Sequence, residues 1–459
     1  MKNIKFYILT WLSLTFLACD DNLELEPISQ LGQGSFYVTE NDYTAAINAV
    51  YSSLREEGQF DDLVLFGEIR SDNTLPVLSG SVTTRTDFSE FSLNSANPRI
   101  QSTWEETYNG IARANSILVR VDEASINEEF KNRVKGETLF LRGLMYFNLV
   151  RIYGDVPLIV SELSPEEALA AGQRDINEIY TQIITDLTTA ASLLPDSYSN
   201  DIGRATSIAA NALLGRVHLT RGDFSLAITE LRKVTAQSPS LVDLLPNYGD
   251  VFDITNEYNA EIIFAVRWTD DGLNGNDFSF SFANVNEPDN KATPDMYADY
   301  EAGDLRRDVT FDATISTVDT ILVKYEFAPP EQGESDWPVI RYADVLLMLS
   351  EALNEEGYVP DGEAFDLLNR VRNRAGLAAL TAAEVPDQEA FRLAIAHERR
   401  VELAGEGHRW FDLVRTGRFM DVMNSKGFNV APRHVVFPIP QREIDNVNDP
   451  SVLSQNNGY

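Results

Sequence analysis

Apolar residues recur along most of this chain at the spacing of one face of an α-helix. In the stretch RYADVLLMLSEAL they fall at positions i, i+3, i+4, i+7 and i+11, which are Tyr342, Val345, Leu346, Leu349 and Leu353. Four further segments follow the same period: residues 42–57, 102–121, 132–154 and 175–195. The pattern predicts a mostly α-helical protein.

Residues 208–240 have the spacing of a tetratricopeptide unit, a helical hairpin that repeats every ~34 residues. Gly215 would allow the second helix to approach closely, and Ala227 and Leu231 would fill the contact between the two helices. A more degenerate copy of the unit uses Ala352, Ala364, Leu368 and Val371. We therefore predict a tetratricopeptide-like scaffold in which helical hairpins stack on one another.

Long polar stretches rich in Asn, Asp, Ser, Gly and Thr interrupt the helical pattern, and alternation within residues 313–327 predicts a few short strands. Long irregular loops on a rigid scaffold are where binding residues usually lie. The predicted organisation is a helical scaffold at about 40–236 and 338–420, loop-rich insertions at about 58–100 and 245–337, and an extended tail at 430–459.

The composition, with 44% hydrophobic and 10% aromatic residues, is that of a packed globular protein. The net charge of −34 limits the partners that can be expected, because so acidic a surface repels phosphate backbones. Nucleic acid is therefore not an expected partner. The only cysteine, Cys19, leaves the rest of the chain without disulfides, so core packing must supply its stability.

The N-terminal segment around Cys19 has the features of a signal peptide. Lys2 and Lys5 precede an uncharged, mostly apolar run at residues 6–18, which is too short to cross a membrane as a helix. A signal that ends in Ala18-Cys19 resembles that of a bacterial lipoprotein, whose cysteine is lipidated and becomes the new N-terminus. We expect a signal peptide at 1–18, a single domain at 19–459 and a lipid anchor at Cys19. The alternative is an ordinary secretory signal in which the cysteine has no role.

Enzyme chemistry has little support in the motifs of the chain. The stretch HERRV at residues 397–401 begins like a zinc-binding His-Glu-x-x-His motif, but Val401 stands where the second histidine must be. No nucleophile elbow and no Walker loop occurs, and the single cysteine lies in the signal. We therefore expect no catalytic activity.

Two C-terminal stretches, HERRVELAGEGHRWFDLVRTGRF (397–419) and FPIPQREIDNVNDPSVLSQNNGY (437–459), resemble the SusD/RagB family. The stretch GETLFLRGLMYFNLVRIYGDVPLI (136–159) is similar to a long helix of that family, and further matches extend along nearly the whole chain. The resemblance implies a SusD-like α-α superhelix with long irregular ligand-binding loops. It also implies an outer-membrane lipoprotein, with Asp20 and Asp21 similar to the signal that sends such proteins to the outer face.

The same resemblance implies a function and a partner. Family members bind nutrients, usually oligosaccharides and sometimes peptides, and pass them to a SusC-like TonB-dependent outer-membrane transporter. Our leading hypothesis is a cell-surface protein that binds a glycan and delivers it to such a transporter. The alternatives are a peptide-binding lid on the transporter and a tetratricopeptide adaptor without a ligand.

Seven charged residues of the C-terminal signature are better explained as a structural network than as a site, because on one or two helices they can pair with one another. They are Glu398, Arg399, Arg400, Glu402, Arg409, Asp412 and Arg415.

Two clusters of polar and aromatic residues are candidates for the ligand face, since flat rings pack on sugar C–H groups and polar side chains bind hydroxyls. The first cluster comprises Asp72, Asn73, Phe88, Phe91 and Arg99. The second comprises Trp268, Asn274, Asn276, Phe278, Phe280 and Phe282. Trp268, which follows an apolar run and precedes two aspartates, is the leading candidate. The three phenylalanines could instead form a strand with one buried face.

Residues 270–277, DDGLNGND, are similar to a calcium-binding loop, but Gly272 and Ser281 occupy positions where oxygen ligands are needed. A structural calcium ion therefore stays an open alternative to our expectation that the protein has no cofactor.

Overall fold

The computed structural model describes residues 36–77, 83–269, 275–284, 289–314, 320–326, 328 and 332–459. Helices dominate these residues and the strands are short, which confirms the predicted mostly α-helical fold. The helices of the first half are α2 (Glu40–Ser53), α3 (Thr83–Ser89), α4 (Pro98–Val121), α5 (Glu128–Tyr153), α6 (Pro165–Ala170), α7 (Ile176–Leu193), α8 (Ser207–Arg221) and α9 (Phe224–Thr235). The later helices are α10 (Phe278–Ala283), α11 (Pro294–Ala298), α12 (Arg307–Thr310), α13 (Tyr342–Glu356), α14 (Glu363–Arg374), α15 (Gln388–Glu402), α16 (Arg409–Arg415), α17 (Phe419–Ser425) and α18 (Gln441–Val447).

Short helical turns and strands complete the fold. The turns are η1 (Glu57–Asp61), η2 (Leu65–Ile69), η3 (Gly249–Phe252) and η4 (Pro432–Val435). The strands form four antiparallel pairs: β1 (Thr74–Pro76) with β5 (Asn290–Ala292), β2 (Val156–Pro157) with β3 (Gln173–Arg174), β4 (Ile262–Val266) with β8 (Trp337–Arg341), and β6 (Phe311–Asp312) with β7 (Ile321–Leu322). The strand β7 lies within residues 313–327, where short strands are predicted, and its partner β6 lies just before that stretch.

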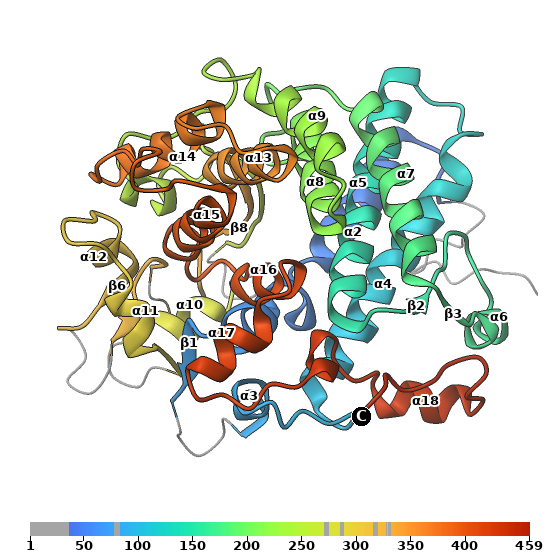
Figure 1. The fold of residues 1–459 in the computed structure, drawn as a ribbon. Coiled ribbons are helices and arrows are strands. Elements are labelled where there is room, and N and C mark those ends of the chain that lie inside the picture. The colour runs from blue at the N-terminus through green and yellow to red at the C-terminus, as the bar shows by residue number, and fades with distance from the viewer. Residues whose placement is uncertain are drawn as a thin grey trace, which may run out of the picture.

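The helices α2, α4, α5, α7, α8 and α9 pack against one another in one half of the molecule (Figure 1). The central helix α5 begins where the side chain of Asn127 accepts a hydrogen bond from the N–H of Phe130, and it ends at Gly154, which has a φ of 74°. Nearly all of its residues from Val134 onward are buried. Neither α5 nor any other helix in the described ranges is long and apolar enough to cross a membrane.

The helices α8 and α9 form the predicted tetratricopeptide-like hairpin. A Cβ atom on Gly215 would overlap with the side chain of Leu231, so only glycine permits the observed approach of the two helices. Ala227 and Leu231 are fully buried in the contact. The degenerate copy, α13 with α14, packs in the same way around the buried Ala352. The prediction of stacked helical hairpins is therefore confirmed.

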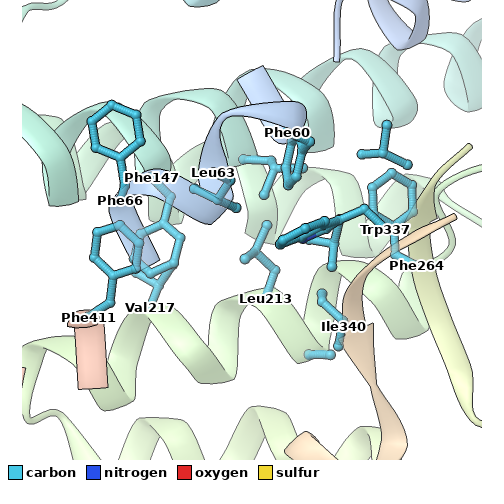
Figure 2. Packing of buried hydrophobic residues seen from close by; sticks show 14 of the residues in the cluster. Phe60, Leu63, Phe66, Phe147, Leu213, Val217, Phe264, Trp337, Ile340 and Phe411 are labelled. Atoms are coloured by element: carbon cyan, nitrogen blue, oxygen red, sulfur yellow. The ribbon is translucent and has the colours of Figure 1, made fainter. Parts of the chain in front are cut away.

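The second half of the molecule is built on the ribbon β4–β8 and on α13, α14 and α15 (Figure 1). The chain enters α13 directly from β8, and α13 packs against α9 of the first half as well as against α14. One apolar core joins the halves. Figure 2 shows Trp337 of β8, Phe264 of β4, Leu213 of α8, Phe60 of η1 and Phe411 of α16 in this core, all of them buried.

Two local expectations were wrong. The alternative of a strand through Phe278 and Phe282 fails because these residues form α10, whose start is held by Asn276 and Asp61 accepting backbone N–H bonds of 3.0 Å and 2.8 Å. The C-terminal tail is not wholly extended, because it contains α18, beside α6 (Figure 1).

Candidate ligand-binding groove

The charged C-terminal signature forms the predicted structural network, but most of its partners lie on distant segments and not on the same helices. Glu402 of α15 accepts hydrogen bonds from Arg306, Arg341 and Arg374. The side chains of Glu402, Arg306 and Arg341 are fully buried. Because each charge is paired inside the protein, this cluster ties α15 to β8, α14 and the start of α12, and it offers no free charge to a ligand.

Two polar residues of the first predicted ligand cluster, Asp72 and Asn73, belong to the same network. Asp72 is 1% exposed and binds Arg409 with distances of 2.7 and 3.0 Å. Burial raises the pKa of Asp72, but Arg409, Arg400 and Lys426 outweigh this effect and hold it well below its usual range. The buried side chain of Asn73 accepts a hydrogen bond from Arg400. The structure therefore places both residues in the interior.

The other members of the first cluster are also engaged. The rings of Phe88 and Phe91 are buried, and the guanidinium of Arg70 lies 4.1 Å from the centre of the Phe91 ring. Arg99 is half-buried and forms an ion pair with Asp62 at 3.2 Å. The structure therefore places both rings in the core and holds Arg99 in a separate ion pair.

Most described residues of the second predicted cluster are buried, so the leading candidate Trp268 lies in the core and not on an exposed ligand face. Trp268 is 2% exposed and packs edge-on against Phe278, with ring centres 5.5 Å apart. Asn276 is buried, donating to the carbonyl of Ser335 and accepting from the N–H of Ser279. Phe280 is partly buried in α10.

Several sequence-based predictions concern residues outside the described ranges, namely the signal peptide at 1–18, Cys19 with Asp20 and Asp21, Asn274, and most of the calcium-like loop at 270–277. Among the residues that are described, no group of three or more His, Cys, Asp or Glu side chains could hold a metal ion.

An open groove lies next to the second cluster, between the end of α2, the loop from α7 to α8 and the segment that enters β4. It consists of two adjoining cavities of about 530 and 190 Å³. Both cavities are lined by Ile202, Gly203, Arg204, Tyr258, Ala265 and Arg267. The larger cavity alone is in the size range of small-molecule sites.

Tyr258 supplies the exposed ring of this groove. Its side chain is 52% exposed, and the guanidinium of Arg267 lies 3.8 Å from the ring centre, which fixes the ring in place. Gly203, with a φ of 97°, lies in the α7–α8 loop next to Tyr258 and Arg267. A Cβ atom at this position would lie 3.1 Å from the Tyr258 ring. The exposed Ile202 extends the apolar surface beside the ring.

Polar groups line the rest of the groove. Arg204 donates hydrogen bonds of 2.8 Å to Glu137 and to Asn48. Tyr51 accepts a hydrogen bond of 2.9 Å from the backbone N–H of Ala205, which holds the loop against α2. The exposed amides of Asn48 and Asn200 line the larger cavity.

Two of the three arginines in the described groove wall, Arg204 and Arg267, are paired with acids, whereas Arg55 donates a hydrogen bond of 3.2 Å to the hydroxyl of Ser52. Arg267 pairs with Glu257 at 2.7 Å and with Asp336 at 3.1 Å. Burial raises the pKa of Asp336 to about 8, and the neighbouring Glu257 adds to the effect although Arg267 opposes it. The groove thus presents an aromatic face with amide and guanidinium donors, a combination suited to a neutral polyhydroxyl ligand.

Sequence reasoning missed Tyr258, Arg267 and Arg204. Tyr258 stands in TNEYNAE, a polar loop just before an apolar run, which is a signal for an exposed aromatic residue. Arg267 adjoins the predicted Trp268. Because successive side chains of an extended segment point to opposite sides, Arg267 faces the groove while Trp268 faces the core.

A tetratricopeptide-like scaffold that presents an aromatic and polar groove defines the class of a helical-repeat binding protein. Two family models match the chain: "Starch-binding associating with outer membrane" over residues 23–219 and "SusD family" over residues 325–459. A SusD-like protein of Formosa agariphila is 30% identical to the chain, covering 100% of it and 99% of the relative. The chain therefore belongs to the SusD/RagB family.

Solved structures agree with this assignment. A "Laminarin binding SusD-like protein" is 30% identical, with a TM-score of 0.80, and the match covers 92% of this chain and 100% of that one. The "Surface glycan-binding protein A from Bacteroides thetaiotaomicron" has a TM-score of 0.79 at 22% identity, covering 92% of this chain and 100% of that one, and shows likeness of fold alone.

Proposed function

We propose that this protein binds a neutral oligosaccharide in the groove around Tyr258 at the cell surface. The observation that carries the proposal is the exposed ring of Tyr258, fixed by Arg267 and flanked by amide groups. Aromatic rings stack on the C–H face of a sugar, and amides and guanidinium groups bind its hydroxyls. The name of the laminarin-binding relative supports the same ligand class.

The charge balance of the groove favours a glycan over a peptide. A peptide site would need free charges to bind the termini or charged side chains. In this groove Arg204 pairs with Glu137 at 2.8 Å, and Arg267 pairs with Glu257 and Asp336. Arg55 is then the one described groove arginine without an ion pair, and among the described lining residues there is no matching free carboxylate pair for the two ends of a peptide. The fixed, exposed ring of Tyr258 in a polar groove is a feature of a ligand site, and a tetratricopeptide adaptor without a ligand does not require it.

The membrane and the partner belong to the same proposal. Cys19 carries the lipid anchor, Asp20 and Asp21 direct the lipoprotein to the outer face, and a SusC-like TonB-dependent transporter receives the glycan. The family-model description, with its association to the outer membrane, supports this location. We propose that the protein binds its ligand without cleaving it.

The groove is tested by calorimetry on the chain from Asp20 onward, with laminarin, starch oligosaccharides, other glycans and a peptide mixture as ligands. We expect saturable binding of a glycan and a loss of at least tenfold in affinity for Tyr258→Ala. Tyr258→Phe, which keeps the ring, and Leu226→Ala, which shortens a side chain 52% exposed on α9, should bind as the wild type does. Binding of peptides alone, or glycan binding unaffected by Tyr258→Ala, would contradict the proposal.

Two further measurements test the anchor and the chemistry. The full chain should partition into detergent with the membrane fraction, whereas Cys19→Ala should be released in soluble form. A TonB-dependent transporter should co-purify with the anchored protein from outer membranes. The bound glycan should keep its length after prolonged incubation, and shortened products would show that the protein is an enzyme.

A further inference from the structure

A second cavity, of about 400 Å³, lies between α5, α7, α8 and α16 and shares no lining residue with the groove. Its charge is opposite to that of the molecule as a whole. Among the described residues, its lining has Asp412 as the one carboxylate and five arginines: Arg151, Arg216, Arg221, Arg399 and Arg415. A cationic cavity in a chain with a net charge of −34 calls for an explanation.

Four of these arginines are neutralised by carboxylates of the protein. Arg216 and Arg399 both bind Asp344, each at 2.6 Å, and Arg399 also binds Asp412 at 2.9 Å. The two remaining pairs are Arg415 with Glu351 and Arg221 with Asp223. These four residues are structural.

Arg151 of α5 differs from the other four. Its guanidinium is held between the rings of Phe147 and Phe411, 4.2 and 4.3 Å from their centres, and both rings are labelled in Figure 2. It donates to the carbonyl of Phe147 and to the side chain of Asn148, both of them neutral groups. No carboxylate in the described parts of the chain forms an ion pair with it. Burial, assisted by Arg216, lowers the pKa of Arg151 to about 9.

The imidazole ring of His408, which also lines the cavity, is available for hydrogen bonding. Its side chain makes no hydrogen bond within the described residues. Burial and the nearby Arg216 lower the pKa of His408 to about 4, so its ring is neutral at pH 7 and offers one donor and one acceptor. An uncompensated guanidinium and an unbonded imidazole thus face the same space.

We propose that this cavity binds the carboxylate of a small organic acid, with Arg151 as its ion-pair partner and His408 as a hydrogen-bond donor. A guanidinium fork matches a planar carboxylate, and the two phenylalanine rings hold that fork in one orientation. The volume suits a ligand of monosaccharide size. This site goes beyond the glycan groove and stands independently of it.

The experiment measures binding of sodium glucuronate, sodium acetate and the uncharged control glucose to the chain from Asp20 onward by calorimetry. We expect saturable binding of glucuronate and none of glucose. Binding of acetate as well would show that the carboxylate alone is recognised, whereas binding of glucuronate only would identify a sugar acid. If neither carboxylate binds, the proposal is overturned.

Arg151→Gln should weaken glucuronate binding at least tenfold, and Arg151→Lys should weaken it too, because an ammonium group has no fork. The matched control is Arg113→Gln, an exposed arginine of α4 that bonds only to the carbonyl of Ala49. Unchanged affinity in Arg151→Gln would refute the assignment. If that variant does not fold, His408→Phe, which removes the donor and keeps a ring, must show a loss of several-fold. Laminarin binding at the groove should be unaffected in every variant, which separates this test from that of the glycan site.

Discussion

Asp61, at the end of η1, shows how one buried carboxyl couples the stability of this protein to pH. Burial and the nearby Asp277 raise the pKa of Asp61 from 3.8 to about 7, although the backbone N–H groups of Asp277 and Phe278 oppose the shift. The pKa of this carboxyl is higher in the folded state than in the unfolded chain. Its contribution to stability is therefore fully present below pH 4 and is lost as the pH rises through 7.

Asp61→Asn should therefore flatten the pH dependence of stability. Between pH 5 and pH 8 the melting temperature of the wild type should fall more than that of the variant, because the amide can still accept both N–H bonds but cannot ionise. Thermal unfolding followed by circular dichroism measures the difference. Asp421→Asn, which removes an exposed carboxylate of α17, is the control, and an equal slope in Asp61→Asn and wild type would contradict the interpretation.

Glu402 is the residue on which the buried charge network converges, since Arg306, Arg341 and Arg374 all bind it. Glu402→Gln leaves these arginines short of a negative charge in a fully buried site. We expect a loss of about 3–5 kcal/mol in the free energy of unfolding, measured by chemical denaturation.

The control for this variant is the exposed ion pair of Glu363 with Arg232, in which both side chains are about half exposed. Glu363→Gln should cost no more than about 1 kcal/mol, because water already solvates both charges. Equal losses of unfolding free energy in the two variants would show that burial does not determine how much these ion pairs contribute to stability.

At the scale of elements, the contact between η2 and the loop after α15 joins segments far apart in the chain. A Cβ atom on Gly67 would overlap with the backbone carbonyl of Gly407, and a backbone group cannot rotate away as a side chain could. This junction fixes the segment that follows η2, including Asp72, against the charged C-terminal signature.

Gly67→Ala should therefore destabilise the protein by about 1–3 kcal/mol or more, the usual effect of overpacking. The control is Gly357→Ala after α13, where a Cβ would meet nothing within 4 Å and the φ of 168° suits any residue. That variant should be neutral or slightly stabilising. Denaturant titration of both variants measures the difference, and a neutral Gly67→Ala would disprove the close contact.

At the scale of the whole molecule, the net charge of −34 sets the response to salt. Self-repulsion acts over long distances and is screened as the Debye length falls from about 30 Å at 0.01 M to about 8 Å at 0.15 M salt. The buried ion pairs around Glu402 are screened much less.

The melting temperature should consequently rise between 0.01 and 0.15 M NaCl. Potassium chloride should produce the same rise, because screening does not depend on the identity of the cation. A falling melting temperature would mean that surface ion pairs, and not self-repulsion, dominate the electrostatic free energy.

Some properties of this protein follow from its sequence alone. The period of apolar residues predicted the helices, and Gly215 with Ala227 and Leu231 predicted the packing of α8 on α9. These signals are local, since periodicity and helix–helix spacing are written within a few turns of chain. The sequence was also sufficient to indicate the SusD/RagB family. Motifs that follow one another in the family's order can be recognised without knowing which residues touch in the folded protein.

Only the tertiary structure decided which aromatic and charged residues are available to a ligand. Trp268 and Phe91 occur in polar sequence and yet lie in the core, whereas Tyr258 is exposed in a groove. Arg151 has no acid partner among the residues that the structure describes, while its neighbour Arg216 is paired with Asp344. Burial and charge pairing depend on partners that are distant in sequence, and a residue's type and local pattern carry no information about those partners until the chain has folded.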